Sequence, residues 1–319
     1  MSASRYISVL TAVVLCVTSC IRENIDECET PVELRFRYWG NGIVDIFPER
    51  IDSVLMFIYE MPSGTLHSAE RITAEALDTL QGAGLRLFPG DYRIVCWGNA
   101  GEGSYIDAGA GKIMAPESRD PENDENSTGI EDLYFGYVDL SVPLTLRPVR
   151  DTLEYESSYI MMTVELIGFG SPDVSGAAAG QENCHSDIRT MDESAPSVRL
   201  VHSDLSAYID FGNRPSDETA DYEPELRAHP ERNDSYVADY MVPEFDNSTA
   251  SVLNVSRRGD GTVIYSRPLS EILDELGITI DTDRQEQQVR LRLVASVGDD
   301  GLVSVDVMGW NTEIVFPDF

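Results

Sequence analysis

Hydrophobic and polar residues alternate along several short segments of this chain, a pattern typical of β-strands with one buried face. In the segment 32–38 the apolar positions fall on every second residue: Val32, Leu34, Phe36 and Tyr38. The same period of two returns at 289–297 and 303–307, on either side of the turn Asp299-Asp300-Gly301. The alternation therefore predicts half-buried strands near both ends of the chain.

Strand-length apolar runs also fill the middle of the chain, and helical periodicity is rare. Two short helices are expected, one at 73–80 and one at 268–277 with Ser270 as its N-cap and Gly277 as its stop. Further strands are expected at 51–59, 85–97 (two strands about the Pro89-Gly90 turn), 133–138, 142–146, 159–169, 198–201, 207–211, 252–255 and 262–265. Many short strands with so little helix predict an all-β fold built from β-sandwiches.

The strand pattern restarts near residue 150, which divides the chain into two halves of domain size. We therefore expect an N-terminal β-sandwich domain at 32–150 and a C-terminal β-sandwich domain at 151–319. No fixed-period sequence repeat relates the two halves, so the expected duplication is one of architecture.

The first residues have the features of a cleaved bacterial export signal. A weakly basic start with Arg5 precedes the apolar run Ile7–Val17, which is too short to span a bilayer as a helix. Val17-Thr18-Ser19-Cys20 then forms a lipobox, in which the cysteine becomes the acylated N-terminus. We predict a lipoprotein signal peptide at 1–19, lipidation of Cys20 and a polar tether at 20–31. The buried N-terminal helix that is the alternative lacks an amphipathic period.

The chain is strongly acidic, with 23 basic and 56 acidic residues and a net charge of −33. This balance excludes nucleic acid as a partner, because the chain has no basic patch that could neutralise phosphates. It also argues against binding to an anionic membrane surface. We interpret the excess of negative charge as that of a self-repelling extracellular surface. Calcium binding by the acidic cluster 120–126 is the alternative, but this cluster lacks the spacing of an EF-hand loop.

Three cysteines remain after Cys16 leaves with the signal and Cys20 is lipidated. In an oxidising compartment Cys28, Cys96 and Cys184 permit one disulfide, and we expect Cys28 to pair with Cys96. Cys96 lies within an apolar strand-like run, where a small buried residue is the ordinary occupant. Cys184-His185 has no metal-site companions at ligand spacing.

The sequence contains none of the familiar catalytic or cofactor-binding motifs. Its four histidines lie far apart, mostly in polar surroundings, and are expected to be surface residues: His67, His185, His202 and His229. Lys112 is the only lysine, which argues against lysine-based crosslinking of domains. We predict a protein that is not an enzyme and that uses no metal and no cofactor, with a surface glycosidase as a remote alternative.

Several of these segments, in this order, resemble one protein family. They are the lipobox Cys20 followed by Cys28, the strand 32–38, the run Ile51–Tyr59, the motif Leu87-Phe-Pro-Gly-Asp-Tyr-Arg-Ile-Val-Cys-Trp-Gly-Asn99 and the final Val305-Asp-Val-Met-Gly-Trp310. Together they are similar to the FimB-like fimbrial anchor subunits of Bacteroidetes, lipoproteins of type V fimbriae. The resemblance covers most of residues 20–310.

The resemblance implies two transthyretin-like sandwiches and a role at the base of a fimbria. Neighbouring fimbrial subunits would be bound by strand exchange, and the lipid on Cys20 would hold the protein in the outer membrane. Stalk subunits of such fibres are trimmed after an arginine, and Arg35, Arg37 and Arg50 are the candidate trimming sites here. A stalk or tip subunit is therefore an open alternative. A surface lipoprotein that binds glycan or host protein through Trp39, Trp97 and Tyr105 is another.

Overall fold

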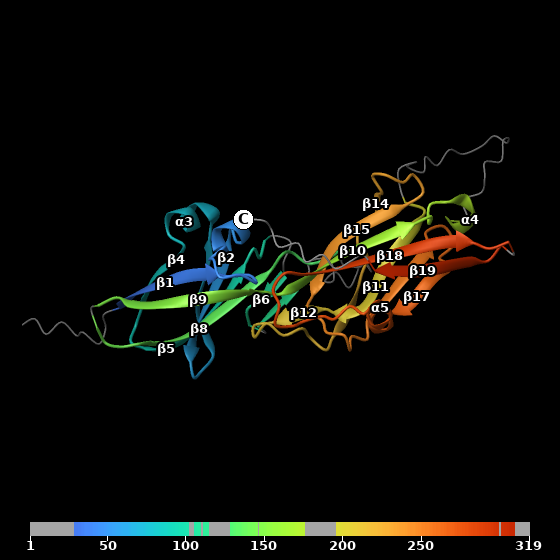
Figure 1. Cartoon of the computed structure of the whole chain (residues 1–319). Coiled ribbons are helices and arrows are strands. Elements are labelled where there is room, and N and C mark those ends of the chain that lie inside the picture. Colours follow the sequence, from blue (N-terminus) through green and yellow to red (C-terminus); the bar gives the residue numbers. More distant parts are fainter. Residues whose placement is uncertain are drawn as a thin grey trace, which may run out of the picture.

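The computed structural model describes residues 29–101, 105–109, 111–114, 128–145, 147–175, 196–299 and 301–309. These residues form two β-sandwiches that follow one another along the long axis of the molecule (Figure 1). Helices are short and few among them. The predicted all-β fold class is confirmed.

The first sandwich is a single seven-stranded sheet in the order β3-β2-β5-β8-β9-β1-β4. Its strands are β1 (Thr30–Tyr38), β2 (Val54–Met61), β3 (Thr65–Ile72), β4 (Gly82–Leu87), β5 (Gly90–Gly98), β8 (Tyr134–Val142) and β9 (Val149–Ser157). Strands β8 and β9 pair over only a short stretch, from Tyr134↔Ser157 to Gly136↔Tyr155. The sheet folds over at this short pairing, so that β3-β2-β5-β8 faces β9-β1-β4 across a shared apolar core.

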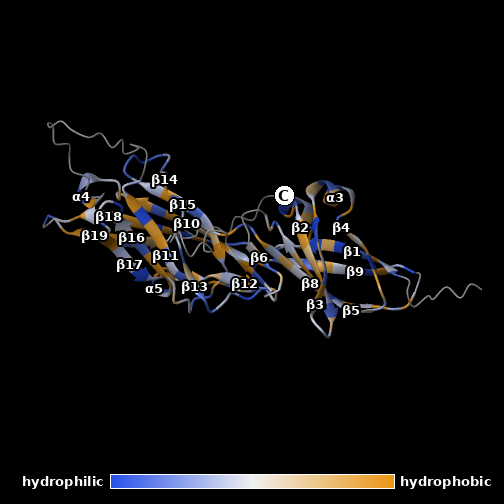
Figure 2. Ribbon diagram, turned by 180° about the vertical axis from the view of Figure 1, so that it is seen from behind, coloured by the Kyte–Doolittle hydropathy of each residue, from blue (hydrophilic) through white to orange (hydrophobic). Residues whose placement is uncertain are grey.

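The second sandwich has two separate sheets around one core, in which hydrophobic and hydrophilic residues alternate along the strands (Figure 2). One sheet has the order β14-β15-β10-β18-β19, and the other β13-β11-β16-β17. The strands are β10 (Tyr159–Ile167), β11 (Val198–Ser206), β13 (Thr219–Tyr222), β14 (Arg227–Ala228), β15 (Tyr236–Pro243), β16 (Val252–Arg257), β17 (Val263–Pro268), β18 (Gln287–Val297) and β19 (Val303–Gly309).

The boundary between the sandwiches differs from the prediction. Strand β9 starts at Val149 but continues to Ser157, and it pairs in parallel with β1 along Val32–Tyr38. The first sandwich therefore ends at Ser157 and not at residue 150. The physical reason is that Leu153 and Tyr155 point into the first core, so cutting the chain at 150 would remove one wall of that core.

The helices are short connections. They are α2 (Phe47–Arg50), α3 (Ala74–Thr79), α4 (Pro172–Ser175) and α5 (Leu269–Leu276). Gly277 closes α5 with a left-handed φ of 64°, as predicted, but Pro268 and not Ser270 occupies the N-cap position. Helix α5 therefore begins at Leu269, which the second core buries together with Ile272 and Leu273.

A small third sheet joins the two halves of the chain. It has the order β12-β7-β6, and its strands are β6 (Tyr105–Asp107), β7 (Lys112–Met114) and β12 (Tyr208–Asp210). Strand β12 comes from the second half, yet its Ile209 enters an apolar cluster with Trp97 and Phe135 of the first sheet. The indole of Trp97 is completely buried there, so the predicted role of Trp97 as a surface contact is wrong.

His202 is fully buried in the second sandwich, contrary to the expectation that the histidines lie on the surface. Its Nδ1 lies 3.1 Å from the hydroxyl of Tyr240, and its Nε2 lies 3.1 Å from the hydroxyl of Ser251. Burial without a charged partner lowers the pKa of His202 to about 3, because the desolvated imidazolium is unfavourable. His202 is thus a hydrogen-bonded neutral residue of the core.

The close approach of β4 to β1 predicts a position-specific cost of adding a methyl group. A Cβ on Gly82 would lie 2.0 Å from the main-chain oxygen of Leu34, whereas a Cβ on Gly84, in the same strand, would meet nothing within 4 Å. Gly82→Ala should lower the free energy of unfolding by about 1–3 kcal/mol, since the backbone must shift to admit it. Gly84→Ala should change it much less. Urea unfolding of both variants measures the difference, and equal stabilities would contradict this packing.

The buried imidazole predicts a loss of stability on acidification. The unfolded chain protonates His202 near pH 6.5, but the folded chain does not until about pH 3. Between these values the unfolded state binds more protons, so stability falls as the pH falls, by about 2 kcal/mol from this residue at pH 5. Urea unfolding at pH 7 and pH 5 should show a smaller loss for His202→Gln than for the wild type. The exposed-site control His67→Gln should behave as the wild type, and identical pH dependence of all three proteins would refute the assignment.

Candidate functional site: the N-terminal strand and the open strand edges

Strand β1 is the first strand among the described residues, and it lies inside the sheet. It pairs with β4 in antiparallel fashion from Thr30 to Arg35 and with β9 in parallel along its length. Its inward side chains are at most 2% exposed: Val32, Leu34, Phe36 and Tyr38. Removing β1 would therefore open a strand-length apolar groove between β9 and β4.

The three arginines named as trimming sites lie in ordered structure. Arg35 and Arg37 point outward from β1, where Arg37 stacks over the ring of Trp39 at 5.5 Å. The backbone around Arg35 is hydrogen-bonded on both sides, opposite Gly82 and Thr152. A protease needs an extended, unpaired chain in its cleft, so it reaches Arg35 or Arg37 only after β1 has left the sheet.

The second sandwich presents strand edges at its C-terminal side. Among the described residues β19 pairs only with β18, and β17 only with β16, so each has one unpaired edge. These edges lie near one another in both ribbon views, with α5 packed against both strands. Val303, Val305 and Val307 turn one face of β19 to the core but remain partly exposed. An alternating, half-buried edge strand of this kind can pair with a further strand.

The outer edge of β3 is different in chemistry. Its burial pattern is almost entirely exposed, and it carries charged or titratable side chains at His67, Glu70 and Arg71. His67 contacts Glu60 at 3.0 Å, and Arg71 donates to the main-chain oxygen of Ala100 at 2.8 Å. Charged side chains on an edge discourage pairing with another chain. The β19 edge is therefore a better candidate for assembly than the β3 edge.

Most of the cysteines for which the sequence predicts a role lie outside the described residues. Cys20, Cys28 and Cys184 all fall there, so lipidation of Cys20 and the Cys28–Cys96 disulfide stay predictions. Cys96 is described, and its side chain is completely buried in β5. Burial raises the pKa of the Cys96 thiol to about 12, so an unpaired thiol at this position stays protonated and unreactive.

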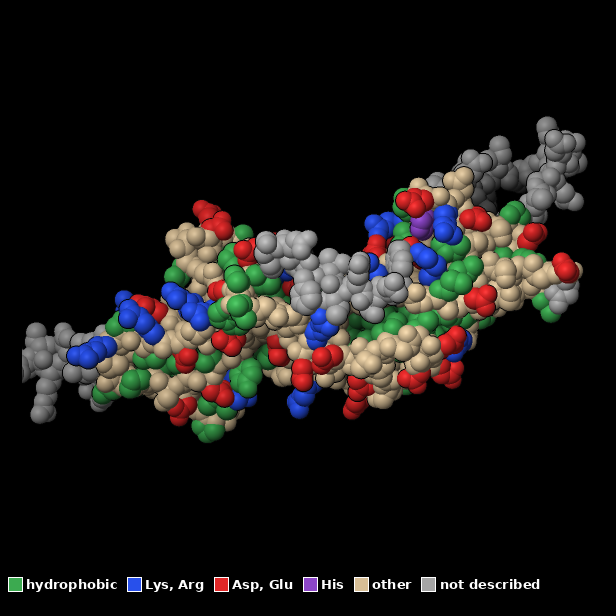
Figure 3. Space-filling view, in the orientation of Figure 1, with side chains coloured by type: hydrophobic (Ala, Val, Ile, Leu, Met, Phe, Trp, Pro, Cys, Tyr) green, Lys and Arg blue, Asp and Glu red, His purple; other side chains and the backbone are tan. Residues whose placement is uncertain are grey.

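The remaining candidate residues do not gather into a chemical site. The acidic cluster 120–126 and His185 lie outside the described residues, and so does the side chain of Tyr105. Within the described part of the chain no three His, Cys, Asp or Glu residues are placed to hold a metal ion. Acidic side chains are spread over both sandwiches in Figure 3 instead of forming one patch. The described residues also contain no helix long and apolar enough to cross a membrane.

The sequence pattern did not predict two strands that bear on this site, β3 and β9. Strand β9 forms the parallel neighbour of β1, and it was not among the expected strands. The signal was present, because Leu153, Tyr155 and Ser157 are buried while Glu154 and Glu156 are exposed. This alternation is short and rich in charged residues, so it is a weaker strand signal than the longer apolar run that follows it.

Several solved structures have the same fold. The fimbrial anchor protein Mfa2 from Porphyromonas gingivalis superimposes with a TM-score of 0.61 at 14% identity, covering 89% of this chain and 98% of that one. A putative adhesin from Bacteroides thetaiotaomicron gives a TM-score of 0.58 at 16% identity, covering 89% and 97%. A structure from the same organism described as putative polysaccharide binding proteins gives 0.58 at 12% identity, covering 90% and 99%. At these identities the likeness concerns the fold.

The family comparison is more specific. No curated protein matches the sequence significantly. The model of the fimbrillin-A associated anchor proteins Mfa1 and Mfa2, however, matches residues 25–316, nearly the whole chain. This agrees with the resemblance to fimbrial anchor subunits noted in the sequence. The chain therefore belongs to the family of fimbrillin-A associated anchor proteins.

Proposed function

We propose that this chain is a non-enzymatic outer-membrane lipoprotein that anchors or terminates a fimbria. The lipid on Cys20 holds it in the membrane, and β-strand complementation joins it to neighbouring subunits. Membership of an anchor family supports a role in a fimbria at the cell surface. The observation that carries the proposal is the complete burial of the inward face of β1, because an intact first sandwich suits the terminal subunit of a fibre.

The distance between the lipid and the first sandwich is short. Thr30 is the first residue of β1, and its hydroxyl donates to the main-chain oxygen of Thr145 at 2.9 Å. The ten residues from Cys20 to Thr30 span at most about 35 Å when fully extended. A lipid on Cys20 would therefore keep the N-terminal sandwich close to the membrane, with the second sandwich directed away from it along the long axis of the molecule (Figure 1).

The fate of β1 distinguishes an anchor from a stalk or tip subunit. A subunit trimmed after Arg35 would lose Val32 and Leu34, and the groove between β9 and β4 would then accept a strand from another subunit. A subunit that keeps β1 has this groove filled by its own chain and can join a fibre only through another edge. The half-buried β19 edge supports the second arrangement.

The lipid anchor predicts the outcome of one substitution. Cys20→Ala removes the only thiol at the lipobox position, so the protein should disappear from the outer-membrane fraction and should no longer incorporate labelled palmitate. Cys28→Ala, which lies in the tether, is the matched control and should fractionate as the wild type. If the Cys20→Ala protein stays in the outer membrane, the lipid is not what holds it.

Retention of β1 predicts the N-terminus of the assembled protein. Because β1 completes the first core, the protein isolated with fimbriae should keep residues 20–37 and carry the lipid. Intact-mass analysis and N-terminal sequencing of the fimbrial preparation decide this. A mature protein that starts after Arg35 or Arg37 would make it a stalk or tip subunit instead.

A further inference from the structure

The chain passes from one sandwich to the other without a flexible linker. Strand β9 ends at Ser157 and β10 begins at Tyr159, so Ser158 alone lies between them. Ser158 is buried, and its amide donates to the main-chain oxygen of Leu133 at 2.9 Å. Because one residue separates two strands that belong to different sandwiches, this crossing holds the two sandwiches next to one another.

A loop of the second sandwich, residues 277–286, contacts the first sandwich beside this crossing. Asn41 and Gln285 form a reciprocal pair: the Asn41 amide donates to the main-chain oxygen of Gln285 at 2.8 Å and accepts from its N–H at 3.0 Å. The side-chain oxygen of Gln285 accepts from the amide of Ser157 at 2.5 Å, and the Ser157 hydroxyl accepts from the amide of Glu286 at 2.8 Å. The loop is thus fixed to β9 and to the segment after β1.

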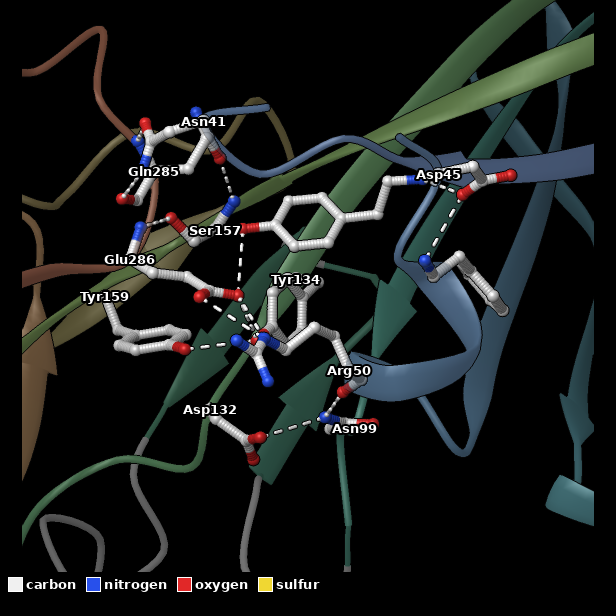
Figure 4. A network of polar contacts seen from close by, with 12 residues as sticks. Asn41, Asp45, Arg50, Asn99, Asp132, Tyr134, Ser157, Tyr159, Gln285 and Glu286 are labelled. Carbon is white, nitrogen blue, oxygen red and sulfur yellow. Dashed lines mark hydrogen bonds and ion pairs between the residues drawn. The ribbon is translucent and has the colours of Figure 1, made fainter. Parts of the chain in front are cut away.

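The carboxylate of Glu286 then collects donors from three elements of the first sandwich (Figure 4). Its Oε1 accepts hydrogen bonds from the hydroxyls of Tyr38 in β1 and Tyr134 in β8, at 3.1 and 3.0 Å. It also accepts from Nε of Arg50 in α2 at 3.0 Å. Tyr134 uses its only proton in this bond, so Tyr159 must donate in the 3.1 Å bond between the two tyrosines. We call Tyr38, Arg50, Tyr134, Tyr159 and Glu286 the junction cluster.

The electrostatics of the junction cluster keep every donor in place. Burial, supported by the Glu286 charge, raises the pKa of Tyr38 and of Tyr134 far above the ordinary value, so both hydroxyls remain donors at any physiological pH. Burial would lower the pKa of Arg50, but Glu286 and the neighbouring tyrosines outweigh this effect and raise it. A partly buried carboxylate with two hydroxyl donors and a guanidinium is well compensated, and removing it leaves all of these donors without their acceptor.

The backbone of Glu286 indicates that the position is held by these contacts. Its φ is +49°, in the left-handed region that a residue with a Cβ rarely adopts. Such a conformation persists where surrounding contacts determine it.

A separate contact between the sandwiches comes from Phe211, next to β12, whose ring lies 5.0 Å from Phe57 and 6.1 Å from Trp97.

We propose that Glu286 locks the two sandwiches into one rigid, cooperatively unfolding body. Its junction cluster then transmits a pull at the N-terminal attachment directly to the second sandwich, in place of a hinge between them. The transmission of force rests on the proposed anchoring function, whereas the rigid coupling is a property of the isolated chain. A subunit held at one end and loaded at the other would rotate about a hinge before bearing load, and a fixed junction removes that slack.

The test compares Glu286→Ala with the matched control Glu275→Ala in the detergent-solubilised mature protein. Glu275 lies on α5 and pairs with Arg267 of β17 at 2.7 Å. It has no part in the junction cluster. The wild type and Glu275→Ala should unfold in a single calorimetric transition, and their small-angle X-ray scattering should fit one rigid body. Glu286→Ala should unfold in two transitions, and its scattering should require several orientations of two folded sandwiches.

A second variant is available at the rim of the junction. If Glu286→Ala does not fold, Asn41→Ala, which removes only the rim pair with Gln285, should move both readouts in the same direction by a smaller amount. A single transition and unchanged scattering for the Glu286→Ala protein would overturn the proposal. Neither readout involves a lipid or a fimbria, so a negative result here is distinct from a negative result with Cys20→Ala.

Discussion

The structure of the N-terminal sandwich depends on one strand being enclosed on both edges and on its inner face. Strand β1 is hydrogen-bonded to β9 and β4, and its inward side chains contribute large buried surfaces to the core, including the ring of Phe36 against Tyr155 at 5.6 Å. The parallel pairing with β9 brings a strand from the end of the domain beside its first strand. Closure of the sandwich therefore requires that β1 stay in place.

The same arrangement recurs in the second sandwich. Strand β10, the first of that domain, pairs in parallel with β18, near its end, and in antiparallel fashion with β15. Each domain thus places its first strand in the interior of a sheet, beside one late parallel strand. In the second domain a further strand, β19, follows the parallel partner and occupies the sheet edge. The two domains differ in this respect, because in the first the parallel partner β9 is the last strand and has β8 as its other neighbour.

Polar residues perform different tasks in the cores and at the junction. His202 is neutral and buried between two hydroxyls, and it serves the packing of one domain. Glu286 accepts hydrogen bonds from two tyrosine hydroxyls of the other domain, beside apolar contacts such as that of Phe211 with Phe57. A carboxylate suits such a contact because it can accept several directional hydrogen bonds at once.

The sequence by itself determined the all-β class and the presence of two domains. It also placed β1, β4, β5, β18 and β19 closely, because each has a strong alternation of apolar and polar residues or a turn at Pro89-Gly90. The sequence also predicts the N-terminal lipobox, which lies outside the residues that the structure describes. The burial of Cys96 also followed from its apolar surroundings.

Tertiary structure alone decided the domain boundary, the burial of Trp97 and His202, and the junction cluster. Strand β9 has only a weak sequence signal, because its exposed face is charged and its buried face is short. Two strands were expected at 133–138 and 142–146, but the structure has one strand there, β8, which ends at Val142. Glu286 and Tyr38 are 248 residues apart in the sequence, and no local pattern records a contact made by two domains meeting in space.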